Sequence, residues 1–168
     1  MLLAGVSVNR AAAVQQLGGN VWPRDWFSDL PAVDMTGTWL FDAAASDPML
    51  ESWKGRGVKY VISHQAAFIV LEFQVPGVQS STQRYSWNGV IQRFERGARQ
   101  VEEAARWTEA GRLLEIVGRD WDPTVSEERS EYRFTYVVNG DQLTFMQESE
   151  SGRTVWRFSR QRLPSRPR

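Results

Sequence analysis

The chain is most informative in what it lacks. It contains no cysteine and a single histidine, His64. Disulfide bonds, a thiolate nucleophile and a zinc site built from cysteines or several histidines are therefore excluded. The sequence also has no glycine-rich phosphate loop and no Ser–His–Asp arrangement. We expect no metal site.

The chain also has no excess of positive or negative charge and no long apolar run. The formal net charge is zero, from 20 basic and 20 acidic residues. Nucleic acids and anionic membranes attract proteins with a basic excess, so we expect no nucleic-acid partner. No apolar run reaches the length of a membrane span, so we expect no spanning segment.

What the chain does contain is a large share of aromatic side chains. It has 168 residues, the length of one domain, with 42% hydrophobic and 24% charged residues. These proportions are ordinary for a globular protein. Eight tryptophans and eight phenylalanines are many for this length. Aromatic residues in excess suit either a core or a binding pocket.

Residues 1–33 are predicted to form an N-terminal extension. Residues 1–13 can be read as a signal-peptide remnant, but we favour a short amphipathic helix over residues 11–17 that Gly18 and Gly19 end. Localisation therefore stays open between the cytoplasm and export. The aromatic stretch 21–27 either packs on the outside of the next domain, which we favour, or acts as a lid over a cavity.

The stretch at 34–42 organises the rest of the chain. Gly37 allows a close backbone approach, and Trp39 and Phe41 then fall on one face of a short strand. A short helix is predicted at Pro48–Trp53, because Pro48 suits the first helical position and Ser46 or Asp47 can cap it. Such a helix would cross one end of a barrel.

After this helix the hydrophobic period changes to two, which predicts strands. Turn signals such as Asn88-Gly89 and Asn139-Gly140 separate them. The predicted strands span 59–65, 68–75, 81–87, 90–94, 100–108, 112–119, 127–137, 142–148 and 153–161.

Tight turns make sequential strands antiparallel neighbours, so the predicted topology is a meander. Closing the meander into a barrel removes its exposed edges, with the strand of Trp39 beside that of Trp156. We therefore predict an all-β protein, an antiparallel barrel of eight to ten strands over residues 34–162. Residues 163–168 are predicted to be a disordered tail.

The opening stretch resembles a known family. Gly37-Thr38-Trp39 is similar to the Gly-x-Trp signature that opens the first strand of lipocalin-like (calycin) barrels. The longer run 36–42, followed by Ser46-Asp47, resembles a group of bacterial lipocalin-like proteins. The resemblance covers residues 34–162 and implies a calycin barrel that holds a hydrophobic molecule.

The same resemblance implies two details. A basic side chain near the end of the last strand should pack over Trp39, with a cation–π contact worth about 1 kcal/mol. The candidates are Arg157, Arg160 and Arg162. The haem-binding pattern of the superfamily has glycines where this chain has Phe41-Asp42-Ala43, so haem is not expected and no other cofactor is indicated.

Alternation along the strands predicts which aromatic side chains face the barrel interior. We expect these side chains to contact the ligand. They are Tyr85, Trp87, Trp107, Tyr132, Phe134, Tyr136, Phe145, Trp156 and Phe158.

Glu103 is the sharpest candidate for chemistry. Ala105 and Trp107 share its face, so its carboxyl group is expected among apolar side chains. Burial there would favour the protonated form, which suits a general acid or base near neutrality. An ion pair with Arg106 or Arg133 is an equally good interpretation. Glu72 and Asp120 are weaker candidates.

His64 is the second catalytic candidate. It shares a face with Tyr60 and Ile62. A lone histidine is more often structural than catalytic, and it cannot hold a metal without carboxylate help.

Two main functions follow from these features. The first is binding of an apolar, aromatic or polyene, small molecule inside the barrel. The alternative is a cofactor-free enzyme of the cyclase or isomerase type, with a carboxylate or tyrosine as acid or base. A filled structural barrel is a third interpretation. Binding leads because the sequence shows no catalytic constellation, and the oligomeric state stays open, a homodimer included.

Overall fold

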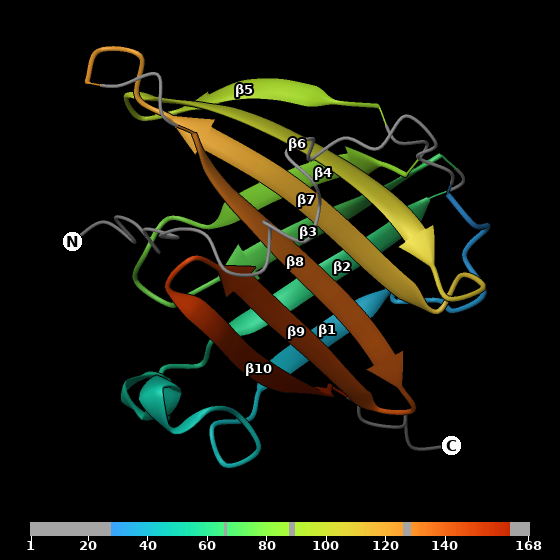
Figure 1. The fold of residues 1–168 in the computed structure, drawn as a ribbon. Coiled ribbons are helices and arrows are strands. Elements are labelled where there is room, and N and C mark those ends of the chain that lie inside the picture. Colours follow the sequence, from blue (N-terminus) through green and yellow to red (C-terminus); the bar gives the residue numbers. More distant parts are fainter. Residues whose placement is uncertain (1–27, 66, 88–89, 126–128, 162–168) are drawn as a thin grey trace, which may run out of the picture.

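The structure is a computed structural model that describes residues 28–65, 67–87, 90–125 and 129–161. Ten antiparallel strands form one sheet that curls into a barrel (Figure 1). The strands are β1 (Gly37–Phe41), β2 (Lys59–Gln65), β3 (Phe68–Gln74), β4 (Ser81–Ser86), β5 (Gln92–Arg96), β6 (Arg99–Thr108), β7 (Leu113–Trp121), β8 (Ser130–Asn139), β9 (Gln142–Ser149) and β10 (Gly152–Arg160). The all-β barrel predicted from the sequence is confirmed, with ten strands.

The expectations for the two ends of the chain lie mostly outside the described residues. These are the signal remnant or helix, the aromatic stretch 21–27 and the tail 163–168.

The strands follow the predicted meander, and the first strand pairs with the last as predicted, but the ring of strands is only nearly closed. Strand order in the sheet is β4-β3-β2-β1-β10-β9-β8-β7-β6-β5. Strand β1 pairs with β10, with Trp39 opposite Arg160 and Phe41 opposite Phe158. The two edges of the sheet are therefore β4 and β5, which follow each other in the chain. The Asn88-Gly89 hairpin expected between them is not formed as a paired ladder, and residues 88–89 lie outside the described part.

The short helix predicted at Pro48–Trp53 is present as a 3₁₀ helix, η2, with the same bounds. Pro48 occupies its first turn and Asp47 stands at the N-cap, but the Asp47 side chain does not cap the helix. Its carboxylate instead accepts a 2.6 Å hydrogen bond from the Val155 backbone N–H. This bond fixes η2 against β10, at the cavity end of the barrel.

The segment before β1 covers the other end of the barrel (Figure 1). Backbone N–H groups of Asp29 and Ala32 donate to the carbonyl oxygens of Trp107 and Gly111, at 2.9 and 2.8 Å. Gly111 has a φ of +80°, and a Cβ there would lie 1.9 Å from the carbonyl oxygen of Leu30. Only glycine allows this close approach, so it fixes the segment on the β6–β7 turn.

The predicted Gly-x-Trp arrangement forms the closed end. Trp39 is fully buried, and its indole N–H donates to the Met35 carbonyl at 2.9 Å. The guanidinium of Arg160 lies 4.2 Å from the centre of the Trp39 ring, which confirms the expected cation–π contact. A Cβ on Gly37 would lie 3.3 Å from the Arg160 Nη1, so the glycine leaves room for this guanidinium.

The other two candidates for that contact are not used in this way. Arg157 donates from its guanidinium to the Ala45 carbonyl, and Arg162 lies outside the described residues.

Large buried side chains fill the closed half of the interior. They include Trp39, Trp107, Ile62, Ile69, Leu114, Ile116, Leu143 and Phe158. Their packing leaves the open volume to the other half, where β3, β5 and β7 end and β4 and β8 begin.

Candidate functional site

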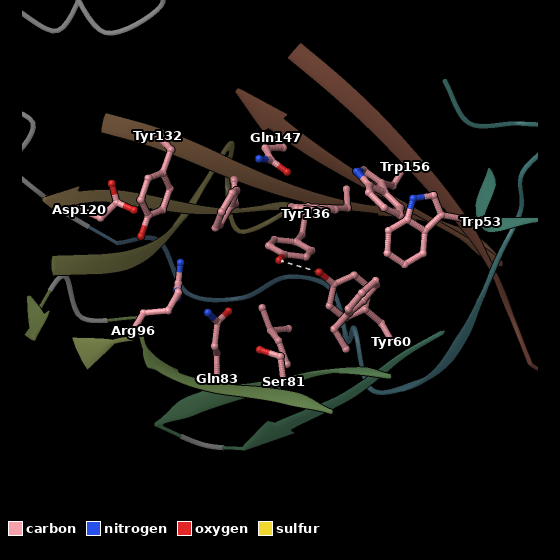
Figure 2. Close-up of a pocket in the computed structure, with 14 residues that line it drawn as sticks. Trp53, Tyr60, Ser81, Gln83, Arg96, Asp120, Tyr132, Tyr136, Gln147 and Trp156 are labelled. Atoms are coloured by element: carbon pink, nitrogen blue, oxygen red, sulfur yellow. Dashed lines mark hydrogen bonds between the residues drawn. The ribbon is translucent and has the colours of Figure 1, made fainter. Parts of the chain in front are cut away.

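A cavity of about 240 Å³ lies inside the barrel, at the end that η2 crosses. Its lining residues are Trp53, Tyr60, Leu71, Phe73, Ser81, Gln83, Arg96, Asp120, Tyr132, Phe134, Tyr136, Phe145, Gln147 and Trp156 (Figure 2). Ser81 is exposed and therefore lies at the rim, whereas Leu71 and Tyr136 are buried. A dry cavity of about 150 Å³ already accepts benzene, so this volume can hold a larger apolar molecule.

The apolar wall of the cavity is made of aromatic rings that hold one another in place. Tyr136 and Phe145 stack with ring centres 4.8 Å apart, and Trp53 meets Trp156 edge-on at 5.5 Å. The Tyr60 hydroxyl lies 3.5 Å from that of Tyr136 (Figure 2). Contacts of this kind limit ring motion, so the cavity is preformed rather than created by a ligand.

A buried carboxylate lies beside this wall. Glu103 on β6 is fully buried, and both hydroxyls that reach it come from tyrosines. Tyr85 donates to its Oε2 at 2.6 Å, and Tyr132 donates to its Oε1. The guanidinium of Arg96 completes the set, 3.2 Å from Oε1. Glu103 is therefore buried among inward side chains, as predicted, and is paired with arginine.

The arginine differs from the two expected ones. Arg106 and Arg133 lie on the outer face of the barrel, where both contact Glu115. Alternation places them on the face opposite Glu103, so neither can reach it.

The position of Tyr132 depends on a glycine in the neighbouring strand. Gly118 on β7 lies opposite Tyr132 on β8. A Cβ at Gly118 would lie 2.3 Å from the Tyr132 ring. The missing side chain lets the ring lie against β7, from where its hydroxyl reaches Glu103.

All four tyrosines of the chain are buried at this site or next to it. Burial raises the pKa of Tyr60 to about 12. Burial, together with the nearby Glu103 charge, raises the pKa of Tyr85 and Tyr132 well above the usual value. The pKa of Tyr136 is likewise raised by burial and by Tyr60. These hydroxyls therefore stay protonated and act as hydrogen-bond donors.

Further polar groups reach the cavity from opposite walls. The amides of Gln83 on β4 and Gln147 on β9 point into it (Figure 2). Gln147 is only 9% exposed. Asp120 on β7 also lines the cavity, and its carboxylate lies 2.6 Å from the guanidinium of Arg99.

Five of the nine aromatic residues predicted to contact a ligand line this cavity. They are Tyr132, Phe134, Tyr136, Phe145 and Trp156. The other four lie deeper, in the core around the closed end: Tyr85, Trp87, Trp107 and Phe158.

His64 also lies outside the cavity lining. Its ring stacks on Trp107 at 5.6 Å and meets Trp87 edge-on at 4.9 Å. Its Nδ1 is 3.8 Å from a carboxylate oxygen of Asp34. These contacts place His64 at the closed end, away from the cavity.

Several lining residues were not predicted, and most had a usable signal. Tyr60 shares a face with His64 by alternation, and Phe73 follows the same rule on β3. Trp53 lies on the helix expected to cross the barrel. Arg96 had no such signal, because the predicted strand ended at Phe94 whereas β5 extends to Arg96.

The described residues contain no group of three or more histidine, aspartate or glutamate side chains able to hold a metal. Within the same ranges, no helix has the length and apolar character needed to cross a membrane.

Comparisons with known proteins place the fold. No protein-family model and no curated protein matches the sequence. Solved structures do match. The "REP1-NXSQ fatty acid transporter" superposes with a TM-score of 0.56 at 11% identity, over 79% of this chain and 99% of that one.

Two further structures match equally well. Lipid binding protein 8 of Caenorhabditis elegans gives a TM-score of 0.56 at 12% identity, over 77% of this chain and 99% of that one. Secretory abundant heat soluble protein 4 of Ramazzottius varieornatus gives 0.57 at 10% identity, over 80% and 100%. The chain thus has the lipocalin-like, calycin-type barrel fold predicted from its Gly-x-Trp stretch.

Proposed function

We propose that the protein binds an apolar small molecule inside its barrel. The observation that carries the proposal is the cavity of about 240 Å³, which aromatic rings from η2, β2, β3, β8, β9 and β10 enclose. Pockets of this kind, mostly apolar with a few polar groups, are typical of small-molecule sites. Aromatic and polyene molecules fit best, because flat conjugated ligands can stack on the Phe145 and Tyr136 rings.

The structural neighbours support the same function. Two of them are named as a fatty acid transporter and a lipid binding protein. At 11% and 12% identity they share the fold with this chain, whose own cavity determines the ligand.

The enzyme alternative has less support in this cavity. Glu103 is not among the cavity-lining residues, whereas Tyr132 and Arg96, which contact its carboxylate, are. A ligand in the cavity would therefore meet a tyrosine hydroxyl with a raised pKa and an arginine, neither of which is a general base near neutrality. The one carboxylate among the lining residues, that of Asp120, is paired with Arg99.

The proposal is tested with N-phenylnaphthylamine, an uncharged probe whose fluorescence rises in apolar surroundings. We expect saturable binding to the native protein. Replacing Gln83 by Trp should fill the cavity from β4 and weaken probe binding by about tenfold or more.

The control uses the adjacent position. Thr82 is exposed and points away from the cavity, so Thr82→Trp should leave probe binding unchanged. Absence of saturable binding, or equal affinity in Gln83→Trp and the native protein, would overturn the proposal.

A further inference from the structure

We propose that the cavity selects ligands with an uncharged, hydrogen-bonding head group, such as an alcohol or a primary amide, over carboxylates and amines. The Arg96–Glu103 pair is the specificity-determining element. This inference rests on the proposed function and specifies its ligand class.

The charges at the cavity wall are balanced. Two charged residues line it, Arg96 and Asp120. Arg96 lies 3.2 Å from the fully buried Glu103, and Asp120 lies 2.6 Å from Arg99. Each charge at the wall thus has an opposite partner, so the cavity offers no net charge to a ligand.

A charged head group would be costly to place in this cavity. A carboxylate would lose its water and gain no net positive partner. To bind Arg96 strongly it would have to displace Glu103, and this would leave a fully buried carboxylate with only the Tyr85 and Tyr132 hydroxyls. Removing the positive partner of a fully buried carboxylate is strongly unfavourable. An ammonium head meets the same difficulty, because Asp120 at the wall is already paired with Arg99 and Glu103 is already paired with Arg96.

Uncharged polar side chains in the cavity are available to a ligand. Gln147 is 9% exposed, and its amide has no hydrogen-bond partner within the described ranges, yet it points into the cavity (Figure 2). Gln83 presents a second amide from the opposite wall. An amide both donates and accepts, so a hydroxyl or amide head can satisfy it without a change of charge.

The test uses three ligands with one chain and different heads: decanol, decanoate and decylamine. Each is titrated against the native protein near neutral pH, with displacement of N-phenylnaphthylamine as the readout. We expect decanol to bind at least about tenfold tighter than either charged ligand. Equal or tighter binding of decanoate or decylamine would overturn the inference.

Two variants connect the selectivity to the ion pair. Glu103→Gln keeps the shape but leaves Arg96 without its partner, so the affinity for decanoate relative to decanol should rise about tenfold or more. Arg96→Gln leaves Glu103 unpaired and should raise the relative affinity for decylamine instead. Arg96 is 46% exposed, so this second variant keeps the test available if Glu103→Gln does not fold.

A matched control is Glu115→Gln on the outer face. Glu115 is also buried and paired with arginines, but it does not line the cavity. Its replacement should leave the decanoate-to-decanol ratio unchanged. Gln147→Leu should lower decanol affinity while probe binding persists. Unchanged ratios in both Glu103→Gln and Arg96→Gln would overturn the assignment to the pair.

The two proposals fail in different ways. If the probe and all three decyl ligands do not bind, the proposed function is wrong and this inference is wrong with it. If the probe binds and the three heads bind equally, the binding function stands and only the head-group inference is wrong.

Discussion

The hydroxyl of Tyr85 donates a 2.6 Å hydrogen bond to the carboxylate of Glu103 across the seam of the barrel. Tyr85 lies on β4 and Glu103 on β6, and β4 is the sheet edge that has no hydrogen-bonded ladder to β5. A side-chain bond therefore holds together two walls that the backbone leaves unpaired.

Ring contacts reinforce the same seam at the closed end. Trp87 follows β4, Trp107 lies on β6, and the His64 ring contacts both. Trp87 and Trp107 were predicted as ligand contacts and His64 as a catalytic residue, but all three rings instead help to close the barrel.

Trp39 should contribute strongly to the stability of the closed end. Its ring is fully buried beneath Arg160, so Trp39→Ala removes a large core aromatic and a cation–π contact. We expect the free energy of unfolding to fall by about 3–5 kcal/mol, measured by denaturant titration. The adjacent Leu40 is 40% exposed, and Leu40→Ala should cost less than about 1 kcal/mol. Equal effects of the two changes would contradict this role.

Gly118 should be intolerant of any side chain. A Cβ there meets the Tyr132 ring at 2.3 Å, so Gly118→Ala has to displace the ring or the strand. We expect a loss of about 1–3 kcal/mol in the free energy of unfolding. In a Tyr132→Leu background the same change should cost clearly less, because the clash is with the ring. Additive effects in this double-mutant cycle would show that the contact is not the cause.

Alternation along each strand was enough to predict much of this interior. Period two gave the correct side for Tyr132, Tyr136 and Phe145, and it placed Glu103 inside. It could not give the height of a residue along the barrel axis. Phe158 and Trp156 share a face of β10, yet Trp156 lines the cavity and Phe158 lies in the core. The position of a residue along the barrel axis depends on the register of every strand pair, so the pattern of one strand cannot predict it.

Partners across the barrel were the least predictable feature. Arg96 pairs with Glu103 because β5 extends farther than its apolar pattern indicated. The Asn88-Gly89 signal pointed to a hairpin between β4 and β5, but the ladder is absent and the seam is closed by Tyr85 instead. Local turn chemistry cannot foresee such a gap, since closure is decided by the whole sheet.

The buried tyrosines predict alkaline instability. Burial raises the pKa of Tyr60 from 10.0 to about 12, and it raises the pKa of the other three as well. The folded state therefore holds protons that the unfolded chain releases above pH 10. The contribution is complete below pH 10 and is lost as the pH rises towards 12.

The loss is steep, up to about 1.4 kcal/mol per pH unit for each tyrosine. Tyrosinate absorbance should not appear at pH 10 in the folded protein, and it should appear together with loss of the β-sheet circular dichroism signal at higher pH. Titration of one or more tyrosines near pH 10 with the fold intact would contradict their burial.

The seam itself is testable through Tyr85→Phe. The change keeps the buried ring and removes only the hydroxyl that donates to Glu103, so the carboxylate stays buried with one donor fewer. Hydrogen bonds to charged groups contribute about 1.5–3 kcal/mol, and we expect a loss of that size in the free energy of unfolding. Because the bond joins β4 to β6, hydrogen exchange should accelerate most at amides of β4 and least in the β8–β9 ladder.

Tyr60→Phe is the matched control, since it removes a hydroxyl whose partner is the uncharged Tyr136. It should lower the free energy of unfolding by less and leave hydrogen exchange in β4 unchanged. Uniform acceleration across all strands in Tyr85→Phe would mean that this hydrogen bond supports the whole fold rather than the seam.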